Sequence, residues 1–169
     1  RIEYQPPPKM NISQHNNAGD SSTFIFKKLR LTRDQINALK SKCSDEEGNV
    51  NVRYTTTEVL SAHVGRCATM AWQLPKDQET KLRIAVNGRA RLRQPELPRG
   101  YFGSVVCYAT PIGLAGELYS NPIKFAAKIV HEAIAQMDNE YLRSAIDYLE
   151  LQPDLNAIAS ILFDYKCPN

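Results

Sequence analysis

Three histidines are the side chains in this sequence most suited to moving protons, because an imidazole titrates close to neutral pH. They are His15, His63 and His131. No histidine has an aspartate four residues later, since Asp20 follows His15 one residue too late and no aspartate follows the other two at that spacing. No GxSxG turn presents a nucleophilic serine. We therefore assign no catalytic residue, and we expect His63 and His131 to take structural places on helices.

Cysteine spacing argues against a metal centre. The four cysteines, Cys43, Cys67, Cys107 and Cys167, are far apart, and there is no CxxC and no short Cys/His spacing. Structural zinc sites are built from such closely spaced ligands. We expect free thiols in a reducing, cytoplasmic setting and no metal site.

One arginine-rich segment has the composition of an anion-binding loop. The run Asn-Gly-Arg-Ala-Arg-Leu-Arg places arginines at Arg89, Arg91 and Arg93. In an extended loop these alternate side chains point one way, and forked guanidinium groups suit phosphates. Gly100 and Gly103, further along, permit close approach of the backbone. The pattern predicts a phosphate site, and a solvated loop paired with acidic side chains is the alternative.

Overall charge and hydropathy exclude two classes of partner. The chain has 169 residues and a formal net charge of +3, which is too mild to indicate nucleic-acid binding. Residues 81–99 hold six basic side chains against one acidic, and residues 132–154 hold six acidic against one basic. No apolar run approaches the roughly 20 residues of a membrane helix. We expect neither a nucleic-acid partner nor a membrane span.

Two capping boxes mark the helices nearest the start of the chain. Thr32 with Gln35 predicts a helix to about residue 42, and Thr55 with Glu58 predicts a second. The apolar face expected for the second helix consists of Val59, Leu60, His63, Cys67, Met70 and Ala71.

The rest of the sequence alternates between strand and helix patterns. Strands are predicted over residues 22–29, 81–86 and 104–110, the last mostly buried, and helices over 121–136, with Asn121-Pro122 as the cap, and 139–151. Elements in this alternation favour a layered α/β or α+β domain.

Several motifs occur in order along nearly the whole chain. They are Tyr-Gln-Pro-Pro-Pro at residues 4–8, Leu-Thr-Arg-Asp-Gln at 31–35, Asp-Gln-Glu-Thr-Lys-Leu at 77–82, the arginine segment at 87–93, Gly-Tyr-Phe-Gly at 100–103, the run at 137–155 and Lys-Cys-Pro-Asn at 166–169. Together they resemble the BAHD acyltransferases. The last two narrow the resemblance to the hydroxycinnamoyltransferases that act on shikimate or quinate.

The resemblance implies part of a two-domain fold like that of chloramphenicol acetyltransferase, with a mixed sheet flanked by helices. Residues 1–21 would be the crossover linker between domains, and residues 22–169 the first part of the C-terminal domain. An acyl-CoA would be the donor co-substrate and a small polyol acid the acceptor, in a cytoplasmic, monomeric parent enzyme. The family's HxxxD and DFGWG motifs would lie outside this chain, which alone is expected to be inactive.

The resemblance assigns Arg89, Arg91 and Arg93 as local candidates for binding CoA. It also shows departures, since Gly65, Asn87 and Ser104 stand where the family pattern usually has Trp, Asp and Asn. The alternative interpretation is a non-catalytic module, from a truncated or diverged relative, that binds CoA or a protein partner.

Overall fold

The computed structural model describes residues 27–44 and 52–154. The predicted linker lies outside these ranges, and so does most of the strand predicted over residues 22–29, whose described end is not a strand. The elements are α1 (Arg33–Ser41), α2 (Thr56–Ala71), β1 (Glu79–Lys81), β2 (Ile84–Asn87), β3 (Val106–Ala109), β4 (Ile112–Leu114), α3 (Ala115–Ser120), α4 (Ile123–Ala135) and α5 (Asn139–Glu150). The expected α/β class is confirmed.

Both predicted capping boxes are present. In α1, the Gln35 amide N–H donates to the Thr32 hydroxyl over 3.2 Å, and the Thr32 N–H donates to the Gln35 side chain over 2.8 Å. Thr55 and Glu58 make the same reciprocal pair at the start of α2. These bonds satisfy amide groups that the first turn of a helix otherwise leaves without partners, so both helices begin where the sequence predicts.

The strands form two short antiparallel ladders. β1 pairs with β4, and β2 pairs with β3. A mixed sheet was expected, but every ladder within the described residues is antiparallel. The single strand predicted over residues 81–86 is divided, because Leu82 and Arg83 separate β1 from β2.

The strand predicted over residues 104–110 is shorter than expected, and the expectation that it is mostly buried is wrong. In β3, Val106 and Tyr108 are 54% and 40% exposed. They lie opposite Asn87 and Ala85 of β2, which are also exposed. Side chains alternate across a strand, and only the opposite face of this ladder, with Ile84, packs into the core.

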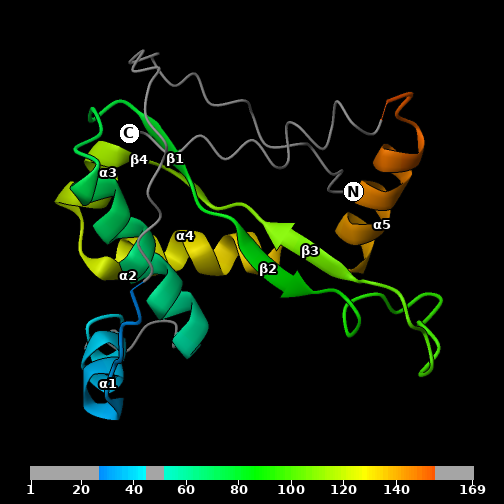
Figure 1. The fold of residues 1–169 in the computed structure, drawn as a ribbon, viewed down its shortest axis with the longest axis horizontal. Coiled ribbons are helices and arrows are strands. Elements are labelled where there is room, and N and C mark those ends of the chain that lie inside the picture. The colour runs from blue at the N-terminus through cyan, green and yellow to red at the C-terminus, as the bar shows by residue number, and fades with distance from the viewer. Residues whose placement is uncertain (1–26, 45–51, 155–169) are drawn as a thin grey trace.

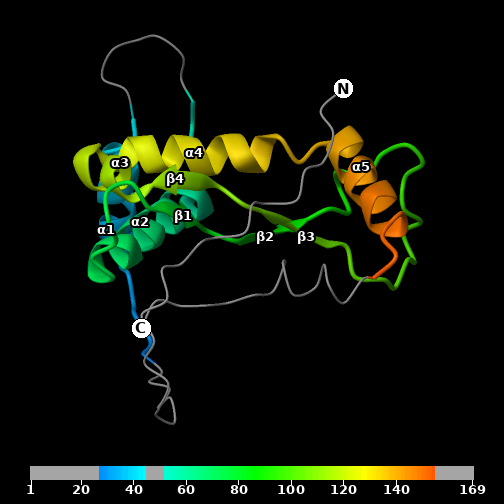
Figure 2. The same ribbon diagram turned by 90° about the horizontal axis from the view of Figure 1, so that it is seen from above.

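Helix α4 runs along the strands, with α1, α2 and α3 at one end and α5 at the other (Figures 1 and 2). Contact between α2 and α4 is the most extensive of any pair of elements. The core consists mainly of Val59 and Ala62 from α2, Ile84, Val86 and Ala109 from the strands, Ile123, Ala126, Ala127 and Val130 from α4, and Leu142 from α5.

The buried face of α2 differs from the predicted one. Cys67 is exposed and Met70 is 53% exposed, whereas Thr69 is buried. Thr69 tolerates burial because its hydroxyl donates to the carbonyl of Gly65 over 2.8 Å and its carbonyl accepts from the Tyr119 hydroxyl over 2.9 Å. Polar side chains are stable in a core when bonded in this way.

The C-terminal helices follow the predicted pattern with small changes at their ends. Asn121 was expected to cap α4, but Pro122 takes that position and Asn121 instead ends α3, which was not predicted. α5 is capped by Asp138, whose carboxylate accepts from the Tyr141 amide over 2.8 Å. Among the described helices, none is long and apolar enough to cross a bilayer.

Candidate functional site

The arginine segment forms a turn after β2 and not an extended loop. The amides of Arg91 and Leu92 both donate to the carbonyl of Gly88, and Leu92 is buried. The amide of Arg89 donates to the side chain of Asn87 over 3.0 Å. Because the turn rotates successive residues, the expectation that the three arginines point one way is wrong.

Arg89 is exposed and forms hydrogen bonds with residues 101 and 103, near the β3 end of the loop between β2 and β3. Its guanidinium donates to the carbonyls of Tyr101 and Gly103, and it lies 5.7 Å from the centre of the Tyr101 ring. Gly103 does allow the close approach that was predicted, but what approaches it is the Tyr101 side chain, which occupies the space that a Cβ would need. Gly100 faces open space.

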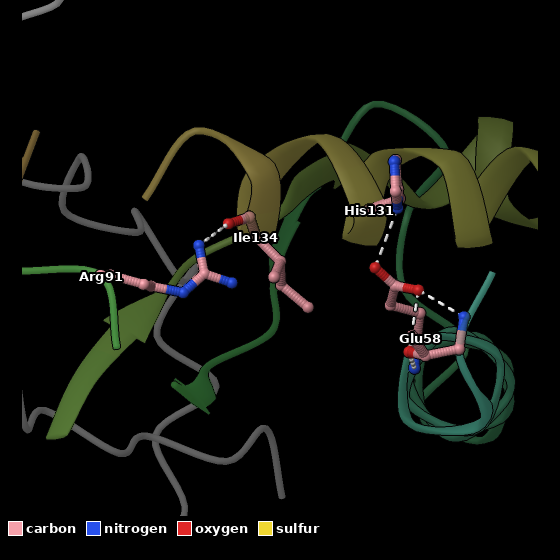
Figure 3. Close-up of polar contacts among 5 residues, drawn as sticks. Glu58, Arg91, His131 and Ile134 are labelled. Carbon is pink, nitrogen blue, oxygen red and sulfur yellow. Dashed lines mark hydrogen bonds and ion pairs between the residues drawn. The ribbon is translucent and has the colours of Figure 1, made fainter. Parts of the chain in front are cut away.

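Arg91 is half-buried and binds the end of α4. Its Nη1 donates to the carbonyls of Ile134 and Met137, each over 2.9 Å, and Figure 3 shows the guanidinium turned toward this helix end. The last carbonyls of a helix have no partners within it and carry partial negative charge. Arg91 therefore fixes the loop to α4.

Arg93 is exposed at the outer side of the turn. Its amide donates to the side chain of Asn139 over 2.9 Å, and its Nε donates to the carbonyl of Ala90 over 3.4 Å. The remaining guanidinium nitrogens of Arg93 and Arg89 lie on the same exposed loop, on side chains that reach solvent. Either side chain can present charge to an anion.

Sequence reasoning missed a second anchor of this loop. Arg143 on α5 donates from Nη2 to the carbonyl of Pro95 over 3.0 Å and from Nε to Asn139 over 3.3 Å. The spacing of Asn139 and Arg143, four residues apart on a predicted helix, shows that they share a face. It does not reveal that this face meets a loop more than 40 residues earlier.

Both described histidines lie on helices, as predicted, but only His131 has a buried polar partner, and His63 is only partly buried. His131 Nδ1 lies 2.9 Å from Oε1 of Glu58 (Figure 3). Its ring meets the Tyr54 ring edge to face at 5.5 Å. His63 lies beside Cys67 on α2, and His15 is outside the described residues.

Glu58 is a buried carboxylate held between two helices. Burial raises the pKa of its carboxyl, but hydrogen bonds from the Thr55 amide, the Thr55 hydroxyl and His131 outweigh burial and set the pKa below its ordinary value. The capping box signalled the contact with Thr55 from sequence. The contact with His131 spans 73 residues, and sequence gave no sign of it.

The positions that depart from the family pattern are accommodated locally. A Cβ at Gly65 would lie 3.4 Å from Leu82, an ordinary contact, and Ser104 is exposed. Within the described residues, no group of three or more His, Cys, Asp or Glu side chains is placed to hold a metal ion.

The model of the Transferase family matches residues 3–166, and the chain therefore belongs to this family, the BAHD acyltransferases. It is 53% identical to a shikimate O-hydroxycinnamoyltransferase from Nicotiana tabacum over 99% of this chain and 38% of that protein. A rosmarinate synthase from Plectranthus scutellarioides is 42% identical over 99% of this chain and 37% of its own length. The chain thus spans less than two-fifths of the curated relatives it matches.

A solved structure shares the fold. The crystal structure of TRI101 from F. sporotrichioides, complexed with coenzyme A and T-2, matches with a TM-score of 0.62 and 16% identity, over 73% of this chain and 29% of that one. At this identity the match shows the fold alone.

Proposed function

We propose that this chain is part of an acyl-CoA-dependent acyltransferase that moves a hydroxycinnamoyl group from CoA to a hydroxyl of a small acid of the shikimate or quinate type. The observation that carries the proposal is 53% identity over almost the entire chain to a shikimate O-hydroxycinnamoyltransferase. Other relatives are named for hydroxycinnamoyl transfer to 5-hydroxyanthranilate. The relatives therefore support the hydroxycinnamoyl group more strongly than they support a particular acceptor.

The full-length protein in this proposal is longer than the chain described. Residues 1–21 are then the linker between two domains, and residues 22–169 open the C-terminal domain. The exposed face of the β2–β3 ladder supports this arrangement, because Val106 and Tyr108 present apolar surface that further polypeptide would cover. The catalytic histidine would come from an HxxxD motif elsewhere in a monomeric, cytoplasmic protein, and this chain alone would not turn over substrate.

The arginine loop is proposed to bind the phosphates of the CoA donor. Arg89 and Arg93 would make direct contact, because their side chains are exposed on one loop, and Arg89 would exchange its bonds to the Tyr101 and Gly103 carbonyls for bonds to phosphate. Arg91, the third arginine in the prediction, would act by holding that loop on α4. Guanidinium groups bind phosphate strongly through paired hydrogen bonds.

An assay of the full-length protein with a hydroxycinnamoyl-CoA and shikimate tests the proposal by following release of the CoA thiol. Arg93→Ala is expected to raise KM for the thioester several-fold with little change in kcat, because a phosphate contact remote from the thioester stabilises ground and transition states equally. Arg53→Ala, at an exposed arginine before α2, is the matched control.

Absence of thioester consumption with shikimate, quinate and hydroxyanthranilate would refute the proposed reaction. Transfer catalysed by the 169-residue chain alone would refute the claim that the catalytic base lies elsewhere. An unchanged KM in the double variant Arg89→Ala/Arg93→Ala would show that the loop does not bind the donor. It would not contradict the proposed reaction.

A further inference from the structure

A thiol and an imidazole lie together on the outer face of α2, away from the arginine loop. Cys67 is exposed, and its Sγ is 3.9 Å from Nδ1 and 3.8 Å from Nε2 of His63. The two residues are one helical turn apart, which places their side chains side by side. An imidazole in contact with a thiol can accept its proton and leave the nucleophilic thiolate.

His63 also lines a cavity of about 450 Å³ between α1, α2 and the start of α4. Two cationic side chains, Lys42 and Arg66, share the lining with apolar groups. Arg66 donates from Nη2 to the Tyr119 carbonyl over 3.2 Å, while its Nε is buried and has no hydrogen-bond partner among the described residues. The cavity thus combines positive charge with an apolar wall beside His63, and Cys67 lies next to this histidine outside the lining.

The other described cysteines lie in more buried surroundings than Cys67. Cys43 is 2% exposed, and burial raises the pKa of its thiol. Burial also raises the pKa of the half-buried Cys107 thiol. Among the described residues, neither thiol forms a hydrogen bond with a histidine, so the two serve as internal references for the reactivity of Cys67.

We propose that Cys67 is a site of reversible modification, at which it forms a mixed disulfide with an anionic low-molecular-weight thiol of the glutathione class. His63 takes the proton of Cys67, and the thiolate attacks one sulfur of the oxidised, disulfide form of that molecule. The bond between Sγ and this sulfur forms as the S–S bond of the reagent breaks. The departing thiolate takes the proton from His63, so Cys67 is oxidised and one half of the reagent is reduced.

The cationic cavity accounts for the choice of an anionic thiol. Lys42 and Arg66 attract the carboxylates of such a molecule to the neighbourhood of His63, which raises its local concentration at the thiol. A neutral disulfide gains nothing from these charges. If the reaction rate of Cys67 depends on the charge of the disulfide, the cavity takes part in the reaction; if it does not, the exposure of the cysteine alone explains its reactivity.

The experiment treats the full-length protein with oxidised glutathione and measures, by peptide mass spectrometry, the rate of adduct formation at each cysteine. Cys67 is expected to react at least about tenfold faster than Cys43 or Cys107. His63→Asn is expected to slow reaction at Cys67 several-fold without slowing Cys107. In strong denaturant the rates should converge, which shows that the difference comes from the fold.

Lys42→Gln tests the cavity, with Lys40→Gln, which lines a different hollow, as the matched control. Lys42→Gln should slow the reaction of Cys67 with oxidised glutathione but leave its reaction with neutral hydroxyethyl disulfide unchanged. Equal native rates at Cys67 and Cys43, or an unchanged rate in His63→Asn, would overturn the proposal. Equal effects of Lys42→Gln on the two reagents would overturn the choice of an anionic thiol.

Discussion

Replacing Glu58 with alanine is expected to destabilise the protein by about 2–3 kcal/mol, because hydrogen bonds to a charged group contribute roughly 1.5–3 kcal/mol each and part of this set is open to solvent. The carboxylate accepts from the Thr55 amide over 2.6 Å, from the Thr55 hydroxyl over 2.8 Å and from His131 over 2.9 Å. Its side chain is 7% exposed, whereas that of His131 is 36% exposed. For this reason we take a value below the additive range of the three bonds, which is roughly 4.5–9 kcal/mol.

Urea unfolding followed by circular dichroism measures the loss. A change of this size lowers the midpoint by about 1 M or more in urea. Glu58→Gln keeps the shape of the side chain and is expected to cost about 1 kcal/mol, since it removes the charge and replaces one accepting oxygen with an NH2 group, which can still donate to Nδ1 of a neutral His131. Combining Glu58→Ala with His131→Ala should give a coupling free energy of about 1 kcal/mol, as expected for residues in contact.

The pH dependence follows from the lowered pKa of the Glu58 carboxyl. A carboxylate whose pKa is lower in the folded state than in the unfolded state stabilises the fold fully above the unfolded value, here about 4.5. That contribution is lost as the pH falls through the folded pKa. The stability difference between the wild type and Glu58→Gln should therefore be constant near neutral pH and shrink below about pH 4.5.

Glu132→Gln on α4 is the control, because its exposed pair with Lys128, 3.8 Å long, should contribute no more than about 0.5 kcal/mol. The reasoning is refuted if Glu58→Ala costs no more than Glu132→Gln. A coupling free energy of zero in the double-mutant cycle would refute the link between the helices and leave the capping box as the role of Glu58.

Three further predictions follow from single contacts. Arg91→Met should cost about 2 kcal/mol in urea unfolding, because two part-buried bonds are lost, one to the Ile134 carbonyl in α4 and one to the Met137 carbonyl just after it, and Arg91→Lys should cost less. Gly88→Ala should cost about 1 kcal/mol, because its Cβ would lie 3.1 Å from Val105 and 3.3 Å from Cys107; a lower thermal midpoint would show this. Thr32→Ala should weaken the exposed capping box of α1 by about 1 kcal/mol, seen as faster amide hydrogen exchange in its first turn, and unchanged exchange would contradict the capping argument.

Local signals in the sequence were enough to predict four of the five described helices. The capping boxes at Thr32 and Thr55 fix the starts of α1 and α2 because both bonding partners lie within four residues of each other. Apolar spacing predicted α4 and α5 within a few residues of their observed ends. β4 and α3 were missed, because three- and six-residue elements are too short to show a period.

The candidate site was harder to predict because its geometry depends on distant partners. The composition of the arginine segment suggested an anion site, but the carbonyls that receive Arg91 lie more than 40 residues further along the chain. The burial of β3 was misjudged for a related reason. An alternation of side chains shows which residues share a face, and only the surrounding fold decides whether that face is covered.

The two ends of the β2–β3 loop are held in different ways. Arg91 holds the turn at residues 88–92 against the end of α4, whereas residues 101 and 103 accept exposed bonds from Arg89. Because both bonds of Arg91 are part-buried, we expect the turn at residues 88–92 to move together with the connection between α4 and α5. Residues 100–103 are joined to this turn through exposed bonds from Arg89, which water can replace at small cost. Any adjustment of this loop to an incoming molecule should therefore begin as a swing of the Tyr101 segment.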